Sequence, residues 1–526
     1  MGALRRIPVR SAARRVRRAL PGVVALAAAA AAPVRCQAPE PLVYTVRAPA
    51  PETQRLEIEV SVPTDGRDVI ELMMPIWSPG YYRVEDYAGK VENLEARDGA
   101  GRALAVERLP PNRWRVRSYG APRVWVRYAL LCAQRSVTTD WVSEELAVLN
   151  GAATFVTLAG GTARPHEVHL EPATGWPRTM TGLPAAPDGE PHHFRARSYD
   201  ELVDSPIVAG DLDIHAFDVD GVPHYLVDVG APAGWDGARA ARDLGRVVSE
   251  TLPLWGALPY DRYVFLDVFR RGGGGLEHAN STLLTANAER VATPAGYLRW
   301  LEFVAHEYFH ALNVKRLRPV ELGPFDYERG PRTPSLWISE GMTSYFADLF
   351  VARAGLAGEA DFLASLSGAI RELQTSPGRL LQTVEQSSLE VWSNSNSGVG
   401  AAATTVSYYV KGQVLGFLLD ARVRRLTAGR RSLEDVMELA YRRYGGARGF
   451  TPGQFEATAG EVAGADLRDW FDAAVRTTDE LEYGEALEWF GLRFRGDGDW
   501  ALQVDADATP AQRAHLAALL ASARGR

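Results

Sequence analysis

The hydrophobic period of the chain changes near residue 230, and this change constrains the fold more than any other feature. From residue 41 to about 208, apolar residues alternate with polar ones, as Leu56, Ile58 and Val60 do. Alternation is typical of half-buried β-strands. After residue 230 the apolar residues recur with helical spacing, apart from a strand-like run at 263–269. The sequence therefore predicts a multidomain α+β protein.

Composition narrows the possible functions. The 526 residues include 58 Lys and Arg and 65 Asp and Glu, which gives a net charge of -7 and argues against a nucleic-acid binder. Two cysteines exclude a disulfide-rich scaffold and a cysteine-based zinc finger. Only 10 histidines are present, so a histidine pair at metal-ligand spacing is informative.

The first 35 residues have the pattern of a signal peptide. An arginine-rich stretch without acidic residues precedes an Ala-rich apolar run at 19–32, which is too short to span a bilayer as a mature helix. We expect cleavage and export, to the periplasm or outside the cell, by the Sec or the twin-arginine route. A mitochondrial-type presequence and an N-terminal anchor are the alternatives. Cys36 and Cys132 could pair in an oxidising compartment, although the sequence cannot place them within bonding distance.

Residues 306–310 read His-Glu-Tyr-Phe-His on a predicted helix that begins at Thr293-Pro294, a favourable N-cap and first position. A spacing of four puts His306 and His310 on one helix face, where they can bind one metal ion. Glu307 lies beside them and can act as general base on a metal-bound water. The alternative is an ordinary set of polar residues on a surface helix.

A catalytic zinc ion takes three protein ligands and keeps one open position. Glu340, near the start of the next predicted helix at 335–355, is the third candidate. The connection from His310 lets the two helices run side by side, and Gly341 allows close packing. Ser344 and Asp348 lie on the same face as Glu340 and are candidates to hold the imidazole rings. The alternative for Glu340 is a first-turn acid favoured by the helix dipole.

Together these motifs resemble the glycyl aminopeptidase family of zinc metallopeptidases, in the gluzincin clan. The resemblance covers about Pro41 to Tyr483 in the expected order. The matching segments are 74–81, 274–278 with Ser281, 306–310 with 313–319, 336–345, and 408–412 with 418–420. This resemblance implies an enzyme that binds one Zn²⁺ and hydrolyses the N-terminal peptide bond of peptides with a free N-terminus. It also implies a preference for a small first residue, Gly or Ala.

The resemblance assigns further roles. Glu277 would hold the free α-ammonium of the substrate, and Gly274 and Gly275 would pair with its backbone. The residues themselves also allow a plain Gly-rich turn at 272–275 with a solvated Glu277. Tyr409, two residues before Lys411, would stabilise the oxyanion; a packing tyrosine is the alternative. Glu307 would take a proton from the zinc-bound water and deliver it to the leaving amine.

We therefore expect five segments. They are a signal peptide at 1–35, an antiparallel β domain at 36–210, a thermolysin-like α+β catalytic domain at 211–357, an α-helical domain at 358–480 and a tail at 481–526. Many family members carry a C-terminal PDZ domain, and the tail is too short for a complete one. We expect no nucleic-acid partner and no stable membrane span after signal cleavage. A zinc endopeptidase and a catalytically silent peptide-binding protein on the same scaffold are the rival functions.

Overall fold

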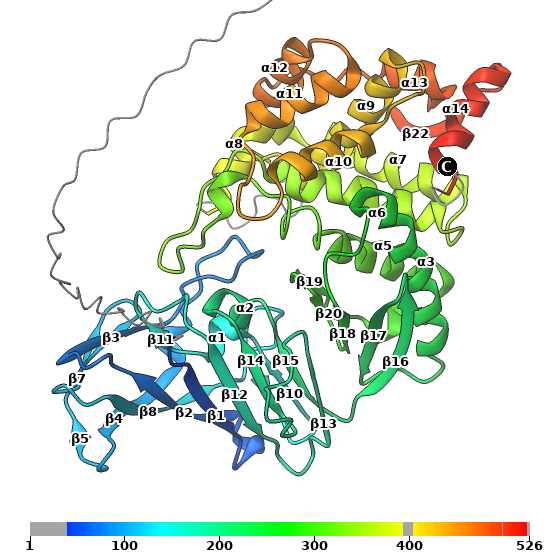
Figure 1. Ribbon diagram of the computed structural model, residues 1–526. Coiled ribbons are helices and arrows are strands. Elements are labelled where there is room, and N and C mark those ends of the chain that lie inside the picture. The colour runs from blue at the N-terminus through cyan, green and yellow to red at the C-terminus, as the bar shows by residue number, and fades with distance from the viewer. Residues whose placement is uncertain (1–38, 393–402, 497, 523–526) are drawn as a thin grey trace, which may run out of the picture. The chain divides into compact units, whose positions relative to one another are not determined.

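The computed structural model describes residues 39–392, 403–496 and 498–522 (Figure 1). The predicted signal peptide and Cys36 lie outside the described residues. In the N-terminal part, the largest sheet has the strand order β14-β12-β1-β2-β8-β4-β5. Its strands are β1 (Leu42–Arg47), β2 (Arg55–Pro63), β4 (Val91–Asp98), β5 (Ala103–Leu104), β8 (Arg123–Leu131), β12 (His166–Glu171) and β14 (His193–Ala196). All its pairs are antiparallel, as predicted, except β1 with β12, which run in parallel.

Two four-stranded sheets complete this β-rich part, with the orders β11-β3-β7-β6 and β13-β15-β10-β9. Their strands are β3 (Val69–Met73), β6 (Val106–Leu109), β7 (Arg113–Arg117), β9 (Trp141–Val142), β10 (Leu146–Leu149), β11 (Thr157–Leu158), β13 (Arg178–Thr181) and β15 (Ile207–Gly210). The short helix α1 (Gly151–Thr154) lies between β10 and β11 in sequence, and the short helix α2 (Tyr199–Val203) precedes β15. Leu56, Ile58 and Val60 are fully buried in the shared core, as their alternation predicts. Cys132 is a buried free thiol there.

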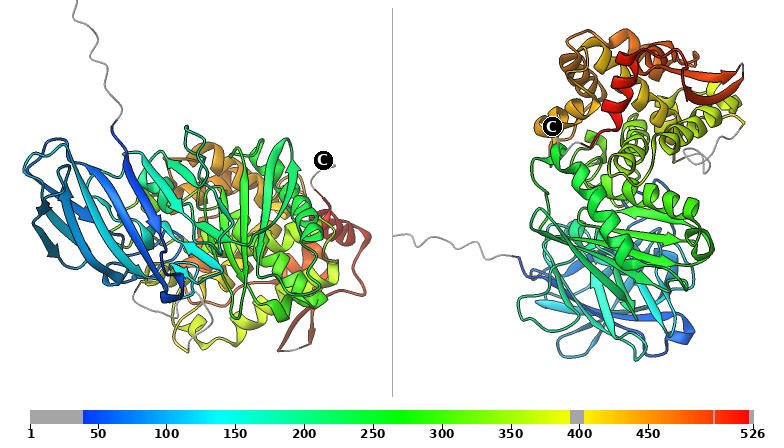
Figure 2. Two further views of the ribbon diagram at one scale, coloured as in Figure 1. Left: turned by 90° about the horizontal axis from the view of Figure 1, so that it is seen from below. Right: turned by 90° about the vertical axis from the view of Figure 1, so that its right-hand side faces the viewer.

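The catalytic part is built on a five-stranded sheet with the order β16-β17-β18-β20-β19. The strands are β16 (Asp213–Val219), β17 (Val222–Val229), β18 (Tyr263–Phe269), β19 (Gly274–Glu277) and β20 (Ser281–Ala286). Helices α3 (Gly237–Trp255) and α5 (Pro294–Phe309) pack against this sheet, and the short α4 (Ala288–Val291) precedes α5 (Figures 1 and 2). Thr293 caps α5 through its side chain, as predicted. Gly274 and Gly275 form an edge strand, not the turn that their composition suggested.

The segment that carries Glu340 begins with a wide π-helical turn, η4 (Trp337–Met342), which continues into α6 (Thr343–Arg353). The helical part follows. Its members are α7 (Glu359–Thr375), α8 (Val384–Leu389), α9 (Tyr408–Leu426), α10 (Leu433–Tyr444), α11 (Pro452–Ala463) and α12 (Arg468–Arg476). Of these, α9 makes the closest packing against η4.

The C-terminal residues pack onto this helical part. They form α13 (Gly484–Phe490), β21 (Leu492–Gly496), β22 (Asp499–Val504) and α14 (Pro510–Leu520). Arg353 Nε of α6 donates a hydrogen bond to the Leu519 carbonyl at 2.9 Å, and Leu502 N donates to Ser367 Oγ at 2.8 Å. Phe490, Leu502 and Leu519 are buried in the same core as the catalytic helices.

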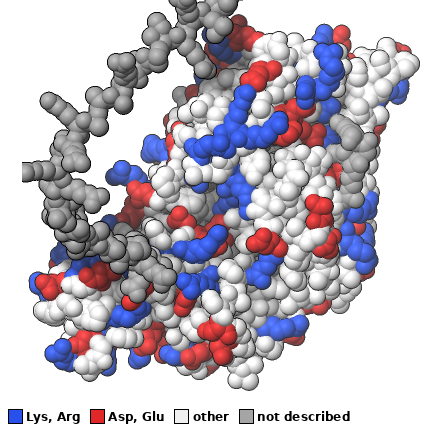
Figure 3. Space-filling view, in the orientation of Figure 1, with Lys and Arg blue, Asp and Glu red and all other residues white. Residues whose placement is uncertain are grey.

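The surface agrees with the composition. On the face shown in Figure 3, acidic and basic side chains are interspersed, so no continuous basic stripe crosses the described residues there. Within the described part of the chain, no helix is both long and apolar enough to cross a membrane.

Two glycines allow η4 to approach α9. A β-carbon on Gly341 would lie 2.3 Å from Gly412 Cα and 2.8 Å from the Tyr408 carbonyl oxygen, both backbone atoms that cannot rotate away. Gly341 therefore fixes the position of its neighbour Glu340, as the sequence predicted.

We expect Gly341→Ala to lower the free energy of unfolding by about 2 kcal/mol or more, because overpacking forces backbone apart. Gly368→Ala on α7 is the matched control, since a β-carbon there meets no atom within 4 Å. That helical substitution should be neutral or stabilising by up to about 1 kcal/mol. Chemical denaturation of both variants measures the difference, and equal effects would contradict the packing argument.

Candidate active site

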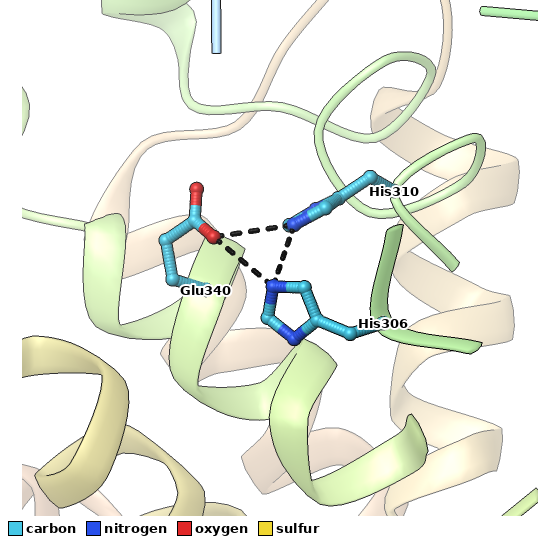
Figure 4. Close-up of side chains that lie close together, drawn as sticks. All are labelled: His306, His310 and Glu340. Atoms are coloured by element: carbon cyan, nitrogen blue, oxygen red, sulfur yellow. Dashed lines mark hydrogen bonds and ion pairs between the residues drawn. The ribbon is translucent and has the colours of Figure 1, made fainter. Parts of the chain in front are cut away.

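Three side chains from two neighbouring helical segments converge on one point (Figure 4). His306 Nε2 and His310 Nε2 lie 3.0 Å apart, and Glu340 Oε2 lies 3.5 Å from the first and 3.2 Å from the second. A tetrahedral ion with bonds of about 2.0–2.1 Å separates its ligands by about 3.3 Å. These three atoms therefore fit around one metal ion. They form the one group of this kind among the described residues.

The other nitrogen of each imidazole is already engaged. His306 Nδ1 lies 3.2 Å from Ser344 Oγ, and His310 Nδ1 lies 2.8 Å from the Asn313 carbonyl oxygen. These contacts orient the rings and leave both Nε2 atoms for a metal. Of the two candidates named from sequence, Ser344 contacts an imidazole, whereas Asp348 contacts other residues. The Asn313 carbonyl was not predicted, because a backbone group leaves no signature in the sequence.

The Asn313 side chain connects the end of α5 to η4. Its Nδ2 donates to the Ile338 carbonyl at 2.7 Å and lies 3.2 Å from the Ser339 carbonyl and 3.0 Å from Thr343 Oγ1. A π-helical turn leaves backbone carbonyls without their usual partners, and these buried groups need a donor. Asn313 supplies it and so holds the turn that carries Glu340 against the histidines.

Glu307 is buried beside the three candidate ligands. Burial raises its pKa to about 8; His310 opposes this rise, and Glu277 adds to it. Strand β19 passes directly over this carboxylate, since a β-carbon on Gly275 would lie 2.2 Å from Glu307 Oε1. A side chain at position 275 would therefore displace the Glu307 carboxylate, and its absence lets the backbone of β19 lie next to that group.

Glu277, the last residue of β19, is only 4% exposed, and its Oε1 has no hydrogen-bond partner in the structure. Burial raises the pKa of Glu277, and the nearby Lys315 ammonium opposes that rise. Lys315 Nζ lies 3.8 Å from Glu277 Oε1 and 2.9 Å from Asp204 Oδ1. Asp204 also accepts the Ala279 backbone N–H at 2.7 Å. Lys315 is thus anchored on Asp204 and only approaches Glu277.

Neither Lys315 nor Asp204 was predicted from sequence. Lys315 lies in the family-like segment 313–319, which gave it no role, and Asp204 follows α2 in the β-rich part. Their contact is formed only when distant parts of the chain meet, so spacing carries no signal for it.

The segment 74–81, recognised only as a family signature, reaches this end of the site. Gly80 has φ +97°, and a β-carbon there would lie 2.4 Å from Glu277 Oε1. Trp77 holds the segment in place, because its Nε1 donates to the Asp326 carbonyl at 2.8 Å. The glycine is therefore required both by its backbone angle and by contact with Glu277.

Tyr409, in the first turn of α9, faces the candidate metal ligands. The centroid of its ring lies 6.1 Å from that of the His306 ring, and Tyr409 lines the cavity that contains His306, His310 and Glu340. Burial, and then the charge of Glu340, raises the pKa of Tyr409, so the phenol stays protonated as a donor. Tyr408 is only 2% exposed and does not line that cavity.

One cavity of 520 Å³ joins these residues. The catalytic, substrate-binding and metal-binding residues predicted from the sequence all contribute to its lining: Gly274, Gly275, Glu277, His306, Glu307, His310, Glu340 and Tyr409. An α+β fold with an HExxH helix, a glutamate from the following helix and a cavity lined by these residues defines a metallopeptidase.

Comparison with known proteins identifies the family. The model of the Peptidase M61 N-terminal domain matches residues 43–211, and that of the M61 glycyl aminopeptidase matches residues 299–415. The chain belongs to the M61 glycyl aminopeptidase family. The resemblance drawn from its motifs and the predicted α+β fold class are thereby confirmed. Among curated proteins, none matches the chain.

Solved structures agree with this assignment. An aminopeptidase N family protein from Idiomarina loihiensis is 28% identical, with a TM-score of 0.82 over 86% of this chain and 78% of that chain. The M1 zinc metallopeptidase from Deinococcus radiodurans is 15% identical, with a TM-score of 0.52 over 84% of this chain and 94% of that chain. A mutant of that enzyme bound to Tyr-Ser-Ala has 14% identity and a TM-score of 0.51, over the same shares of the two chains. At these identities the two M1 structures show a shared fold.

Removing the Ser344 hydroxyl should weaken metal binding. We expect Ser344→Ala to lower affinity for a divalent ion such as zinc by about 10- to 100-fold, because His306 loses the contact that orients its ring. Competition with a chelator measures the affinity. Ser249→Ala is the control, since Ser249 Oγ bonds only to the Gly245 carbonyl within α3. Unchanged affinity in Ser344→Ala would refute the orienting role.

Proposed function

We propose that the protein is a zinc-dependent aminopeptidase that removes a small first residue, Gly or Ala, from peptides. One observation carries this proposal. The buried Glu277 carboxylate, whose Oε1 accepts no hydrogen bond, lines the same cavity as the three candidate metal ligands. A buried carboxylate that lacks a full set of partners requires a cation, and a peptide's free α-ammonium is a cation of suitable size.

His306, His310 and Glu340 would hold the zinc ion. Two imidazole nitrogens and one carboxylate oxygen form a ligand set typical of catalytic zinc, which leaves one position open. When bound, zinc polarises the scissile carbonyl and lowers the pKa of water. The zinc metallopeptidase from Deinococcus radiodurans, which shares the fold, supports this choice of metal.

The protein's own groups supply the proton transfers and the positioning. Glu307 in its ionised form accepts a proton from the attacking water and passes it to the leaving nitrogen, since it lies beside the ligands and burial raises its proton affinity. Tyr409 donates a hydrogen bond to the developing oxyanion, an effect worth roughly 3 kcal/mol in other enzymes. The exposed edge of β19 pairs with the substrate backbone at Gly274 and Gly275, where no side chain intervenes.

The end of the cavity at Glu277, where the substrate's α-ammonium would bind, favours an aminopeptidase over an endopeptidase. A neighbouring space shares Gly80 and Glu277 with the catalytic cavity, and its volume is only 20 Å³. That volume accommodates about one water molecule, not a further peptide residue. Gly80 and Trp77 thus close the chain path behind Glu277, which also leaves little room for a large first side chain.

Loss of the Glu277 charge should abolish recognition of a free N-terminus. We expect Glu277→Ala to lower kcat/KM for glycyl and alanyl arylamides by about 100-fold or more, because truncating one partner of a buried charged pair costs several kcal/mol. Steady-state kinetics on zinc-loaded protein measure it. Glu57→Gln on the exposed side of β2 is the matched control. Cleavage of N-acetylated peptides by the wild type would instead identify an endopeptidase.

A further inference from the structure

The catalytic cavity carries more negative charge than the proposed mechanism uses. Five of the described residues that line it carry a carboxylate, and no Lys or Arg is among the described lining residues. The carboxylates are Glu277, Glu302, Glu307, Glu340 and Asp348. The proposed function employs three of them, for the amine, the proton and the metal. Glu302 and Asp348 have no part in it.

These two acids lie at the end of the cavity opposite Glu277. Glu302 precedes His306 by one turn of α5, whereas Lys315, which approaches Glu277, follows His310 and donates its backbone N–H to the His310 carbonyl at 3.0 Å. The eight residue steps from 302 to 310 correspond to a rise of about 12 Å along the helix. Along α5 the order is therefore Glu277, the metal ligands, then Glu302.

Asp348 approaches the same end from α6. Its Oδ2 accepts hydrogen bonds from Ser365 Oγ at 2.6 Å and Gln413 Nε2 at 2.8 Å. Gln413 follows Tyr409 by one turn of α9, and Asp348 follows Ser344 by one turn of α6. Glu302, Asp348 and Gln413 thus form a second level of the cavity, one helical turn from His306, Ser344 and Tyr409 respectively.

The charges at this level are poorly compensated. Burial, and next the charge of Asp348, raises the pKa of Glu302 to about 8, while Arg299 on the outer side opposes the rise and Asp361 adds to it. Burial raises the pKa of Asp348 to about 6, against its two hydrogen bonds. A cation bound between the two carboxylates would lower both pKa values and return both groups to their charged forms.

A second cavity borders this end. Its volume is 970 Å³, and it shares Glu302 and Ser365 with the catalytic cavity. A peptide fixed by its ammonium at Glu277 would extend past the metal ligands toward these two residues. Glu277 Oε1, which has no hydrogen bond and lies 3.8 Å from Lys315 Nζ, sets the direction of the substrate.

We propose that Glu302 and Asp348 select a cationic side chain, Lys or Arg, on the residue that follows the scissile bond. This selection rests on the proposed aminopeptidase function, because Glu277 must hold the N-terminus. The second residue then lies next to the metal ligands, one helical turn or about 6 Å from Glu302. A lysine or arginine side chain spans that distance with its charged end.

Three peptides of equal length test the selection: Gly-Lys-Ala, Gly-Gln-Ala and Gly-Glu-Ala. We expect kcat/KM of the zinc-loaded wild type to fall in that order, with about tenfold between the Lys and Glu peptides. In Glu302→Gln with Asp348→Asn, the ratio of kcat/KM for the Lys peptide to that for the Gln peptide should fall to about one. Glu372→Gln, on the exposed side of α7, is the control and should keep the ranking.

Thermal unfolding shows whether the double variant is folded, and the single variant Glu302→Gln, at a half-buried position, gives the same comparison if it is not. Equal rates for the three wild-type peptides, or a ranking that survives in the folded variants, would overturn the selection alone. If the wild type cleaves none of the peptides, the aminopeptidase function fails, and the selection fails with it.

Discussion

The site depends on the hydrogen bonds that join the end of α5 to the wide turn η4. Asn313 donates to carbonyls of that turn, and Gly341 lets it pack against α9. Together they hold Glu340 Oε2 within 3.5 Å of both histidine nitrogens. Without these contacts, the two histidines would remain a pair on one helix and would lack the third ligand that a catalytic zinc requires.

Unbalanced negative charge is the second organising constraint. Carboxylates placed in one buried cavity raise each other's pKa and can ionise together only if cations compensate them. Beside Glu277 the protein places the Lys315 ammonium and anchors it on Asp204, so that Glu277 is only partly satisfied. The remaining charge accounts for three proposed occupants in a line: the α-ammonium, the metal ion and a basic side chain.

Local rules made much of this predictable from sequence. The cap at Thr293, the spacing of His306 and His310 and the small residue after Glu340 each follow from helix geometry, and the structure has all of them. Contacts between distant segments were not predictable. The composition of Gly274 and Gly275 also allowed a turn, yet they form an edge strand because they pair with Leu284 and Thr285 of β20. The meeting of Gly80, Lys315 and Asp204 around Glu277 likewise depends on tertiary packing.

The zinc content of purified protein after exhaustive dialysis tests the central claim most directly. The wild type should retain one zinc ion per chain, and so should Glu307→Gln, because Glu307 lies beside the ligands without being one. His310→Ala and Glu340→Gln should retain far less. Stoichiometric zinc in either of these two variants, or its loss from Glu307→Gln, would contradict the assignment of His306, His310 and Glu340 as the metal ligands.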